Sequence, residues 1–258
     1  MADTKMPSMV ITGAARGIGR HLAVAAAAAG YHVVISARST AENPNHAMTG
    51  TLDEVASEIE AAGGSVTAVS ADLAHPEGVA TLIDAVRSGP GCDVLVNNAA
   101  VSFNGAFLEV PMRRWAPVIA VNLTAPVELT HALLPDMVAR GSGAIVNVSS
   151  GSAVEDHALQ LPYAATKAAL ERFATGLHSQ YANTGVLFPC LRIDELVMTE
   201  AVALAGVMPE GLTRHDPAEV GRALLWMSGR PELSGRVTTM GDLRAAGRLT
   251  AGTLRPLG

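Results

Sequence analysis

Short β-branched runs alternate with longer alanine-rich segments along almost the whole chain, and this alternation limits the folds that the chain can adopt. The short runs predict strands because they are rich in Val, Ile and Thr, whereas the long segments repeat apolar residues with the period of a helix. Strands that alternate with helices favour a parallel sheet covered by helices on both faces. The sequence therefore predicts a single α/β domain over residues 1–258, with a doubly wound parallel sheet of about seven strands.

The expected elements follow one another without a Pro/Gly/Ser-rich linker. The strands lie near Met9–Thr12, His32–Ser36, Val66–Ser70, Val94–Val96, Ala144–Ser149, Val186–Phe188 and Val237–Met240. The helices lie near Ile18–Ala29, Leu52–Ala62, Val79–Ser88, Met112–Arg140, Tyr163–Ala182 and Ala218–Ser228. Asp216 followed by Pro217 gives the last helix an N-cap and a favoured first residue.

Composition and charge exclude several classes of protein. The apolar runs are shorter than the roughly 20 residues of a membrane span, and the start MADTKMPSMV has no basic segment before an apolar one, so we expect no secretory signal. Cys92 and Cys190 form no CxxC motif, which suits a reducing compartment. The net charge of -6 argues against nucleic acid, and scattered histidines argue against a metal. We expect a soluble, cytoplasmic protein.

The first expected strand runs directly into the sequence TGAARGIG, and a helix follows at once. The glycines of this turn are Gly13, Gly17 and Gly19. Glycine lets the backbone turn tightly and approach a pyrophosphate, which then lies against unpaired N–H groups at the helix N-terminus. A plain glycine turn is the alternative. Strand, glycines and helix in this order favour a nucleotide and a Rossmann-type sheet.

Two further motifs follow this turn. Asn97–Ala100 reads NNAA after the fourth strand, and Tyr163 precedes Lys167 in a YxxxK motif. Together with TGxxxGxG, these motifs resemble the short-chain dehydrogenase/reductase family over almost the whole chain. Asn122 and Ser150 fall where that family places its other two catalytic residues, and Ser150 precedes Tyr163 by the usual thirteen residues. The inserted loop NPNHAMTGTL and the RID stretch resemble a subgroup that includes hydroxysteroid-dehydrogenase-like proteins.

Tyr163 and Lys167 lie four residues apart in an alanine-rich helix, so their side chains share one face. Lys167 is one of only two lysines, against sixteen arginines. A positive charge about 5 Å from the phenol is worth about 3 kcal/mol at an effective dielectric constant of about 20, or about two pKa units. We therefore expect Lys167 to lower the pKa of Tyr163 toward the range of acid–base catalysis. A surface tyrosine beside a snorkelling lysine is the alternative.

The family resemblance implies hydride transfer at these residues. Tyr163 would exchange a proton with the substrate oxygen, Ser150 would hydrogen-bond the same oxygen, and Lys167 would also hold the nicotinamide ribose. Asn122 would anchor a water that links Lys167 to solvent. A hydrolase built on Ser150 and the nearby Asp156–His157 pair is a weaker alternative, because the chain has no G-x-S-x-G elbow there.

The second expected strand ends at Ala37, where many nicotinamide enzymes carry an acid that binds the adenine ribose. Arg38 follows this position, and Arg16 precedes the second glycine of the turn. Two guanidiniums without a carboxylate suit a dianionic 2′-phosphate, so we predict NADP (NADPH) as the cofactor. A strand-end arginine in solvent is the alternative for Arg38.

By resemblance, the cofactor would contact the glycine turn, the end of the third strand, NNAA, the catalytic pair and the segment after the sixth strand. These positions are Gly13, Arg16, Gly17, Ile18, Gly19, Arg38, Asp72, Leu73, Asn98, Ala99, Ala100, Tyr163, Lys167, Leu196 and Thr199. The chain departs from the family pattern in NNAA for NNAG, in Ile193-Asp194 for Pro-Gly, and in the ending TTMGDLRAAG. None of these departures alters a catalytic position.

The long apolar segment 195–217 follows the sixth strand, and we expect it to close over the substrate as a lid. Open α/β sheets bind ligands at this carboxyl edge. The opposite wall, residues 150–161, has no lysine or arginine. The expected substrate contacts are Ser152, His157 and Met198, and the expected substrate is a hydrophobic ketone, aldehyde or alcohol. An ordinary amphipathic helix is the alternative for the lid.

These features predict an NADP-dependent oxidoreductase that interconverts a hydrophobic carbonyl compound and its alcohol. A 3-oxoacyl thioester reductase is the second reading, in which Arg113 and Arg114 would receive an acidic carrier protein. A non-catalytic sensor of NADP is the third, although it would not need the catalytic residues. By resemblance, the helices Met112–Arg140 and Tyr163–Ala182 would build a homodimer or homotetramer.

Overall fold

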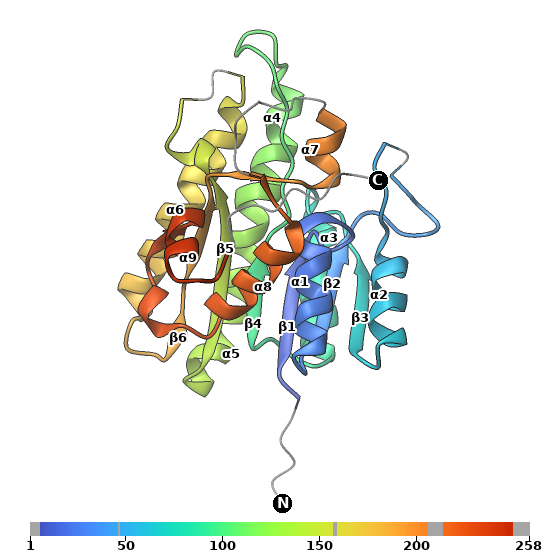
Figure 1. The fold of residues 1–258 in the computed structure, drawn as a ribbon, viewed down its shortest axis with the longest axis vertical. Coiled ribbons are helices and arrows are strands. Elements are labelled where there is room, and N and C mark those ends of the chain that lie inside the picture. The colour runs from blue at the N-terminus through green and yellow to red at the C-terminus, as the bar shows by residue number, and fades with distance from the viewer. Residues whose placement is uncertain (1–5, 46, 157–158, 206–213, 250–258) are drawn as a thin grey trace, which may run out of the picture.

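Parallel strands form the central layer of the molecule (Figure 1). The computed structural model describes residues 6–45, 47–156, 159–205 and 214–249. In these residues one eight-stranded sheet has the order β10-β7-β5-β4-β1-β2-β3, with β6 paired to β5. Its strands are β1 (Ser8–Thr12), β2 (His32–Ala37), β3 (Ser65–Ser70), β4 (Val94–Asn97), β5 (Gly143–Ser150), β6 (Val186–Leu187), β7 (Cys190–Ile193) and β10 (Val237–Thr239). The predicted doubly wound α/β fold is confirmed.

Helices cover both faces of this sheet. Alternate residues of a strand point to opposite faces, so Val33 and Ile35 pack in one cluster of buried residues and Val34 packs in the other. The first cluster includes residues of α1 (Gly17–Ala28), α2 (Leu52–Ala61), α8 (Pro217–Met227) and α9 (Met240–Ala245). The second includes residues of α3 (Pro76–Ser88), α5 (Ala125–Arg140) and α6 (Leu161–Tyr181).

The order of the strands changes direction between β1 and β4, which are neighbours in the sheet. β2 and β3 continue from β1 on one side, and β5 and β7 continue from β4 on the other. Open α/β sheets bind ligands beyond the carboxyl ends of the strands at such a switch point. The glycine turn after β1 and the NNAA motif after β4 therefore meet where a ligand is expected.

Two elements beside prolines differ from the expectation. The expected strand Val186–Phe188 is β6, which ends before Pro189, a residue with no N–H to donate to the ladder, and β7 beyond it was not predicted. Pro126 lacks the N–H that would bond the carbonyl four residues earlier, and a π-helical turn, Ala120–Thr124, separates α4 (Met112–Ile119) from α5. The predicted helix Met112–Arg140 thus consists of three consecutive pieces, with Asn122 in the π turn.

Several short elements were not predicted from the sequence. They are α7 (Glu200–Ala205), the strands β8 (Leu196–Val197) and β9 (Arg214–His215), which pair with each other, and the 3₁₀ turns Gly151–Ala153 and Pro231–Leu233. Helix α9 begins at Met240, where the pattern predicts the end of a strand, because Thr239 and Asp242 form a capping box. The predicted cap at Asp216 is present, since its carboxylate accepts a 2.8 Å hydrogen bond from Ala218 N–H.

Candidate active site

The turn after β1 has the backbone geometry that its glycines predict. Gly13 and Gly17 have φ angles of 69° and 54°, in the left-handed region that favours glycine. At Gly19, an added Cβ would lie 2.3 Å from the Gly13 carbonyl oxygen and 2.6 Å from Asn98 Nδ2. The strand β1, the start of α1 and the loop after β4 therefore approach one another so closely that only glycine fits at this position.

Side chains from β1 and the loop after β4 hold the turn in place. Asn98 Nδ2 donates hydrogen bonds to the carbonyl oxygens of Thr12 and Gly13, at 2.8 and 3.2 Å. Thr12 Oγ1 accepts hydrogen bonds from the N–H groups of Asn98 and Ala99, both at 3.0 Å. The structure thus brings the predicted cofactor residues Gly13, Asn98 and Ala99 together, with Ala100 exposed after them. Sequence reasoning did not assign Thr12 this role.

The N-terminus of α1 fits the phosphate groups of a dinucleotide. The first N–H groups of a helix have no partner inside the helix. Within the described part of the chain, Arg16 at the N-cap makes no side-chain cap, and the first turn, which includes Ile18, contains no acid. Exposed N–H groups at the positive end of a helix bind anions. The glycine turn therefore forms a cradle that suits a pyrophosphate.

We expect Gly19→Ala to lower the free energy of unfolding by about 1–3 kcal/mol, because its methyl group would overlap the Gly13 carbonyl oxygen. Gly176→Ala in α6 is the matched control. Nothing lies within 4 Å of an added Cβ at Gly176, so this change should stabilise the protein by about 0.5–1 kcal/mol. Urea denaturation measures both effects. Equal stability of the Gly19→Ala and wild-type proteins would contradict the close packing described above.

The two predicted guanidiniums lie near the ends of β2 and β3 and already have partners. Arg16 donates to Ser39 Oγ at 2.7 Å and to the Gly50 carbonyl oxygen at 2.8 Å, and burial lowers its pKa. Arg38 is exposed, with NH1 3.9 Å from a carboxylate oxygen of Asp72. A hollow of about 370 Å³ lies here, lined by Arg38, Ser39, Asn43, Pro44, Asn45, Ser70 and Asp72. The structure thus brings Arg38 and Asp72 together, whereas Arg16 is directed to the inserted loop.

The residue after Asp72 differs from it in exposure. Leu73 is 6% exposed and packs in the second core cluster with residues of α3. Asp72 Oδ1 accepts a 3.0 Å hydrogen bond from Ala74 N–H, which fixes the turn after β3. Of this predicted adenine-binding pair, Asp72 is therefore the one that borders the hollow, and Leu73 supports it from the core.

Ser150, Tyr163 and Lys167 come together between the end of β5 and the first turns of α6. Ser150 hydrogen-bonds the Tyr163 side chain. Lys167 is 2% exposed, and its Nζ donates to the Val148 carbonyl oxygen at 2.7 Å. The same Nζ lies 5.5 Å from the centroid of the Tyr163 ring. The structure thus places a hydroxyl pair and an ammonium at the carboxyl end of β5.

Burial changes the pKa of both members of the Tyr163–Lys167 pair. It lowers the pKa of Lys167 to about 8, since an ammonium is disfavoured away from water. Burial raises the pKa of Tyr163, and the hydrogen bond with Ser150 acts in the opposite direction. The direction is therefore opposite to the expected lowering, because burial of the phenol is the largest effect on its pKa. Tyr163 is therefore protonated at neutral pH.

Asn122 is fully buried in the π turn and reaches the loop that follows NNAA. Its Oδ1 accepts a hydrogen bond from Val101 N–H at 2.9 Å, and its Nδ2 donates to the Val101 carbonyl oxygen at 3.0 Å. Nδ2 also donates to Thr166 Oγ1 at 3.2 Å, next to Lys167 in the chain. Asn122 thus links this loop to α6. Single π turns occur frequently at functional sites.

A chain of polar side chains that sequence reasoning missed extends from Ser150. Ser150 Oγ lies 3.4 Å from Ser152 Oγ, which lies 3.4 Å from Gln160 Oε1. Gln160 Nε2 donates in turn to Asn104 Oδ1 at 3.0 Å. The predicted substrate residue Ser152 therefore lies beside Ser150, whereas His157 lies outside the described residues. The signal for Gln160 is its place as a polar residue in the apolar stretch LQLPY.

A second group that sequence reasoning missed is a largely buried ion pair near Lys167. Arg192 on β7 donates to both carboxylate oxygens of Glu171 on α6, at 2.8 and 2.7 Å. Ser149 Oγ donates to the same carboxylate at 2.8 Å. Glu171 lies one helical turn after Lys167, so this pair fixes this part of α6 against the strands β5 and β7.

Two departures from the family pattern meet in the structure. Asp194, in place of the usual glycine, accepts a 3.0 Å hydrogen bond from Met240 N–H at the start of α9. Glu195 pairs with both His215 and Arg244, the latter on α9. The chain after β7 is therefore anchored to the C-terminal helix that the unusual ending TTMGDLRAAG forms.

The segment predicted to be a lid reaches the cofactor cradle at Thr199 and at the residue that follows it, Glu200. Thr199 Cγ2 lies 3.2 Å from the position of a Cβ built on Gly17. Leu196 belongs to β8, and Met198 donates its N–H to the next small strand, β9, at 3.0 Å. Residues 206–213 of the predicted lid lie outside the described residues.

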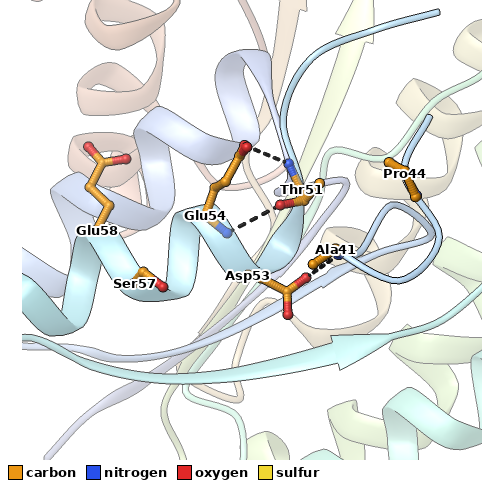
Figure 2. Close-up of a pocket in the computed structure, with 7 residues that line it drawn as sticks. All are labelled: Ala41, Pro44, Thr51, Asp53, Glu54, Ser57 and Glu58. Atoms are coloured by element: carbon orange, nitrogen blue, oxygen red, sulfur yellow. Dashed lines mark hydrogen bonds between the residues drawn. The ribbon is translucent and has the colours of Figure 1, made fainter. Parts of the chain in front are cut away.

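A larger, open hollow lies beside the start of α2 and shares Pro44 with the hollow at Arg38. Its volume is about 740 Å³, and it is lined by Ala41, Pro44, Thr51, Asp53, Glu54, Ser57 and Glu58. Figure 2 shows Thr51 and Glu54 in a capping box and Asp53 accepting a hydrogen bond from Ala41 N–H at 2.6 Å. Glu58 pairs with Arg20 at 2.8 Å. We place the functional site at the glycine turn instead, because the acids of this hollow already serve the local structure.

The chain belongs to the short chain dehydrogenase family, whose pattern matches residues 7–193. A short chain dehydrogenase from Pseudocercospora fijiensis is 34% identical over 181 residues, which make up 69% of this chain and 56% of that protein. A 3-oxoacyl-[acyl-carrier-protein] reductase from Synechocystis sp. is 35% identical over 179 residues, 69% of each protein. The chain thus spans little more than half of the length of the first of these relatives.

Solved structures agree with this family and with the predicted fold. One from Beutenbergia cavernae, assigned as an NAD(P) dependent gluconate 5-dehydrogenase with bound NADP, is 32% identical. The alignment covers 93% of this chain and 97% of that one, with a TM-score of 0.77. The predicted family is confirmed, and the subgroup stays a prediction.

Proposed function

We propose that the protein is an NADP-dependent oxidoreductase that interconverts a hydrophobic ketone or aldehyde and its alcohol. The observation that carries this proposal is that Ser150, Tyr163 and Lys167 come together at the carboxyl edge of the parallel sheet, the same edge that carries a glycine turn suited to a pyrophosphate. Family membership supports hydride-transfer chemistry. The presence of Asn122 and the other three catalytic side chains argues against a protein that only senses the cofactor, because sensing needs no proton donor.

NADPH, when bound, supplies a hydride to the carbonyl carbon of the substrate. The residues of this chain act on the carbonyl oxygen. Ser150 would donate a hydrogen bond to that oxygen and orient it next to the phenol. Tyr163 would transfer its proton to the oxygen as negative charge develops there. Lys167, buried beside the ring, would stabilise the phenolate that remains. In the oxidation direction, Tyr163 takes the proton back.

We expect NADPH to bind at least about tenfold more tightly than NADH, because a charge-assisted hydrogen bond is worth about 1.5–3 kcal/mol. Arg38 should supply most of this preference, since Arg16 is already bonded to Ser39 and Gly50. Arg38→Ala should therefore remove the preference. Arg230→Ala, which removes an arginine stacked on Trp226, is the control. Fluorescence titration that gives the wild-type protein equal affinities for both nucleotides would contradict this prediction.

The substrate that we propose is uncharged and apolar. Val154, Leu159 and Leu161 are exposed on the segment between Ser150 and Tyr163, and Leu204 is exposed on α7. Each CH₂ group buried against such side chains contributes about 0.8 kcal/mol, so specificity constants should rise with apolar substrate size. The gluconate 5-dehydrogenase relative favours a sugar acid instead, but residues 150–161 contain no lysine or arginine to bind a carboxylate.

NADPH oxidation with a panel of cyclic and aryl ketones, aldehydes, keto acids and sugars tests this function. We expect the larger apolar ketones to give the highest specificity constants. A panel in which small keto acids or sugars perform better would overturn the proposed substrate class. Absence of oxidation with every carbonyl compound, together with tight NADPH binding, would favour the sensor.

A 3-oxoacyl thioester reductase is the second candidate function, and the Synechocystis relative favours it. Arg113 and Arg114 are exposed at the start of α4, next to the exposed Met112. They would attract an acidic carrier protein, although the net charge of -6 opposes that approach. Acyl thioesters in the same substrate panel separate the two candidates.

We further propose a cytoplasmic homodimer or homotetramer. The stretch Met112–Arg140 is long and apolar enough to cross a membrane, yet half of its most apolar window is buried inside this molecule. Ile119 and Val127 are exposed on it at 41% and 37%. Packing against a second copy would cover these side chains. Light scattering at micromolar concentration should report at least a dimer, and a monomer would refute this assembly.

A further inference from the structure

Glu200, the first residue of α7, places its carboxylate at the glycine turn. Its Oε2 lies 3.6 Å from the position of a Cβ built on Gly17. The same oxygen is fully buried and has no hydrogen-bond partner among the described residues. Figure 1 shows α7 at the edge of the sheet where α1 begins. A buried carboxylate oxygen thus adjoins the place where a pyrophosphate is expected.

The charge of this carboxylate matches the end of the helix that it approaches. The N-terminus of a helix carries a partial positive charge, which favours an anion. Helix α1 has no acid in its own first turn and no side-chain cap at Arg16. The negative charge of Glu200 also raises the pKa of Arg16, although burial lowers this pKa by more. Glu200 is therefore the anion that this end of the helix meets in the described structure.

We propose that Glu200 competes with the phosphate groups of the dinucleotide for the N-terminus of α1. This inference rests on the proposed function, since it assumes a dinucleotide in the glycine turn. A phosphate bound in the glycine turn and the Glu200 carboxylate would be close together, and their negative charges would repel each other. Cofactor binding then requires the Glu200 side chain to leave Gly17. The free energy needed to move this side chain lowers the observed affinity for every cofactor that carries a pyrophosphate.

The competition differs in kind from the effect of Arg38. Arg38 distinguishes NADPH from NADH because only NADPH carries the 2′-phosphate. Glu200 faces the expected place of the pyrophosphate, which both nucleotides share. Its removal should therefore strengthen the binding of NADPH and of NADH by the same factor. If Glu200 supported the cofactor site, its substitution would weaken cofactor binding. The proposed competition predicts the opposite, a gain in affinity.

Titration of Glu200→Gln with NADPH and NADH by tryptophan fluorescence tests the proposal. We expect both dissociation constants to fall by about three- to tenfold. Glu77→Gln is the matched control, because Glu77 is an exposed acid in the first turn of another helix, α3, and should leave both constants unchanged. Glu200→Ala should show the same gain as Glu200→Gln. Unchanged or weaker binding in both Glu200 variants would overturn the proposal.

Inorganic pyrophosphate gives a readout that is independent of the nicotinamide and of turnover. Its dissociation constant should fall in Glu200→Gln by a similar factor. Without any ligand, the variant should melt at a slightly lower temperature than the wild type, since α1 loses a favourable anion. Failure of all proteins to bind either nucleotide would contradict the proposed function. Pyrophosphate binding that the substitution does not strengthen would contradict the competition alone.

Discussion

Tyr163→Phe is expected to lower turnover by about two to four orders of magnitude and to leave the affinity for NADPH nearly unchanged. The change removes only the phenol oxygen, so the substrate loses its proton donor, and a positioned general acid contributes a factor of about 10² to 10⁴. Burial raises the pKa of Tyr163, which keeps the phenol protonated at neutral pH. Steady-state NADPH oxidation measures turnover, and fluorescence titration measures affinity.

Tyr181→Phe is the matched control for this experiment. Tyr181 is the last residue of the same helix, α6, and its ring packs on Phe188 with the ring centroids 6.2 Å apart. Loss of its hydroxyl should leave turnover almost unchanged. If Tyr163→Phe retained a tenth of the wild-type activity, another group would have to supply the proton.

The fold could be predicted because most of its elements are marked by residues that they contain. Val33, Val34 and Ile35 form a continuous apolar run, as expected for a parallel strand that is buried on both faces. The pattern misses β7, which follows Pro189, and it predicts one continuous helix across Pro126, where one missing N–H interrupts an element whose apolar periodicity continues. Periodicity reports which side chains are buried, whereas continuity also depends on backbone donors.

The proximity of Tyr163 and Lys167 could be predicted because their spacing is local. Tyr163 and Lys167 share one helical face. Other contacts of the site could not be predicted, because their partners are distant in the sequence. Asp194 bonds to a backbone group 46 residues away, and Glu195 pairs with a side chain 49 residues away. Arg16 donates a hydrogen bond to the carbonyl oxygen of Gly50, 34 residues later in the chain. Its guanidinium is therefore directed to the loop and not to the 2′-phosphate position that the motif predicts.

The pKa of Tyr163 is a second property of the site that sequence spacing alone does not determine. Charge and helical spacing alone predict that Lys167 lowers it, because they fix the distance between the two side chains. They do not fix the burial of the phenol, which is the largest effect on its pKa and acts in the opposite direction. Burial is a property of the assembled core. It lowers the pKa of Lys167 to about 8 and raises the pKa of Tyr163.

Lys167→Met is expected to raise the free energy of unfolding at pH 7 by about 1–3 kcal/mol, although it should strongly reduce turnover. Burial lowers the pKa of Lys167 from 10.5 to about 8, so keeping this ammonium charged in the folded protein is unfavourable. Methionine fills a similar volume without a charge. The lost hydrogen bond to the Val148 carbonyl oxygen offsets part of the gain.

The pH dependence identifies the cause of this gain. Below about pH 8 Lys167 is charged in both the folded and the unfolded wild-type protein, so the full burial penalty is present. Between about pH 8 and 10.5 the folded protein binds fewer protons than the unfolded chain, and wild-type stability rises relative to the variant. The advantage of Lys167→Met should therefore be largest near pH 7 and shrink as the pH approaches 10.5. Urea denaturation at several pH values measures this difference.

Arg192→Met gives the contrasting case, because it replaces a second, largely buried cation by the same residue. Arg192 is paired with Glu171 through two hydrogen bonds, at 2.8 and 2.7 Å, so its removal leaves a buried carboxylate without its cation. We expect this variant to lose about 2–4 kcal/mol of stability, with little change between pH 8 and 10. The two substitutions should thus have opposite signs. A Lys167→Met protein that is as destabilised as Arg192→Met would show that the ammonium is held by more than one carbonyl oxygen.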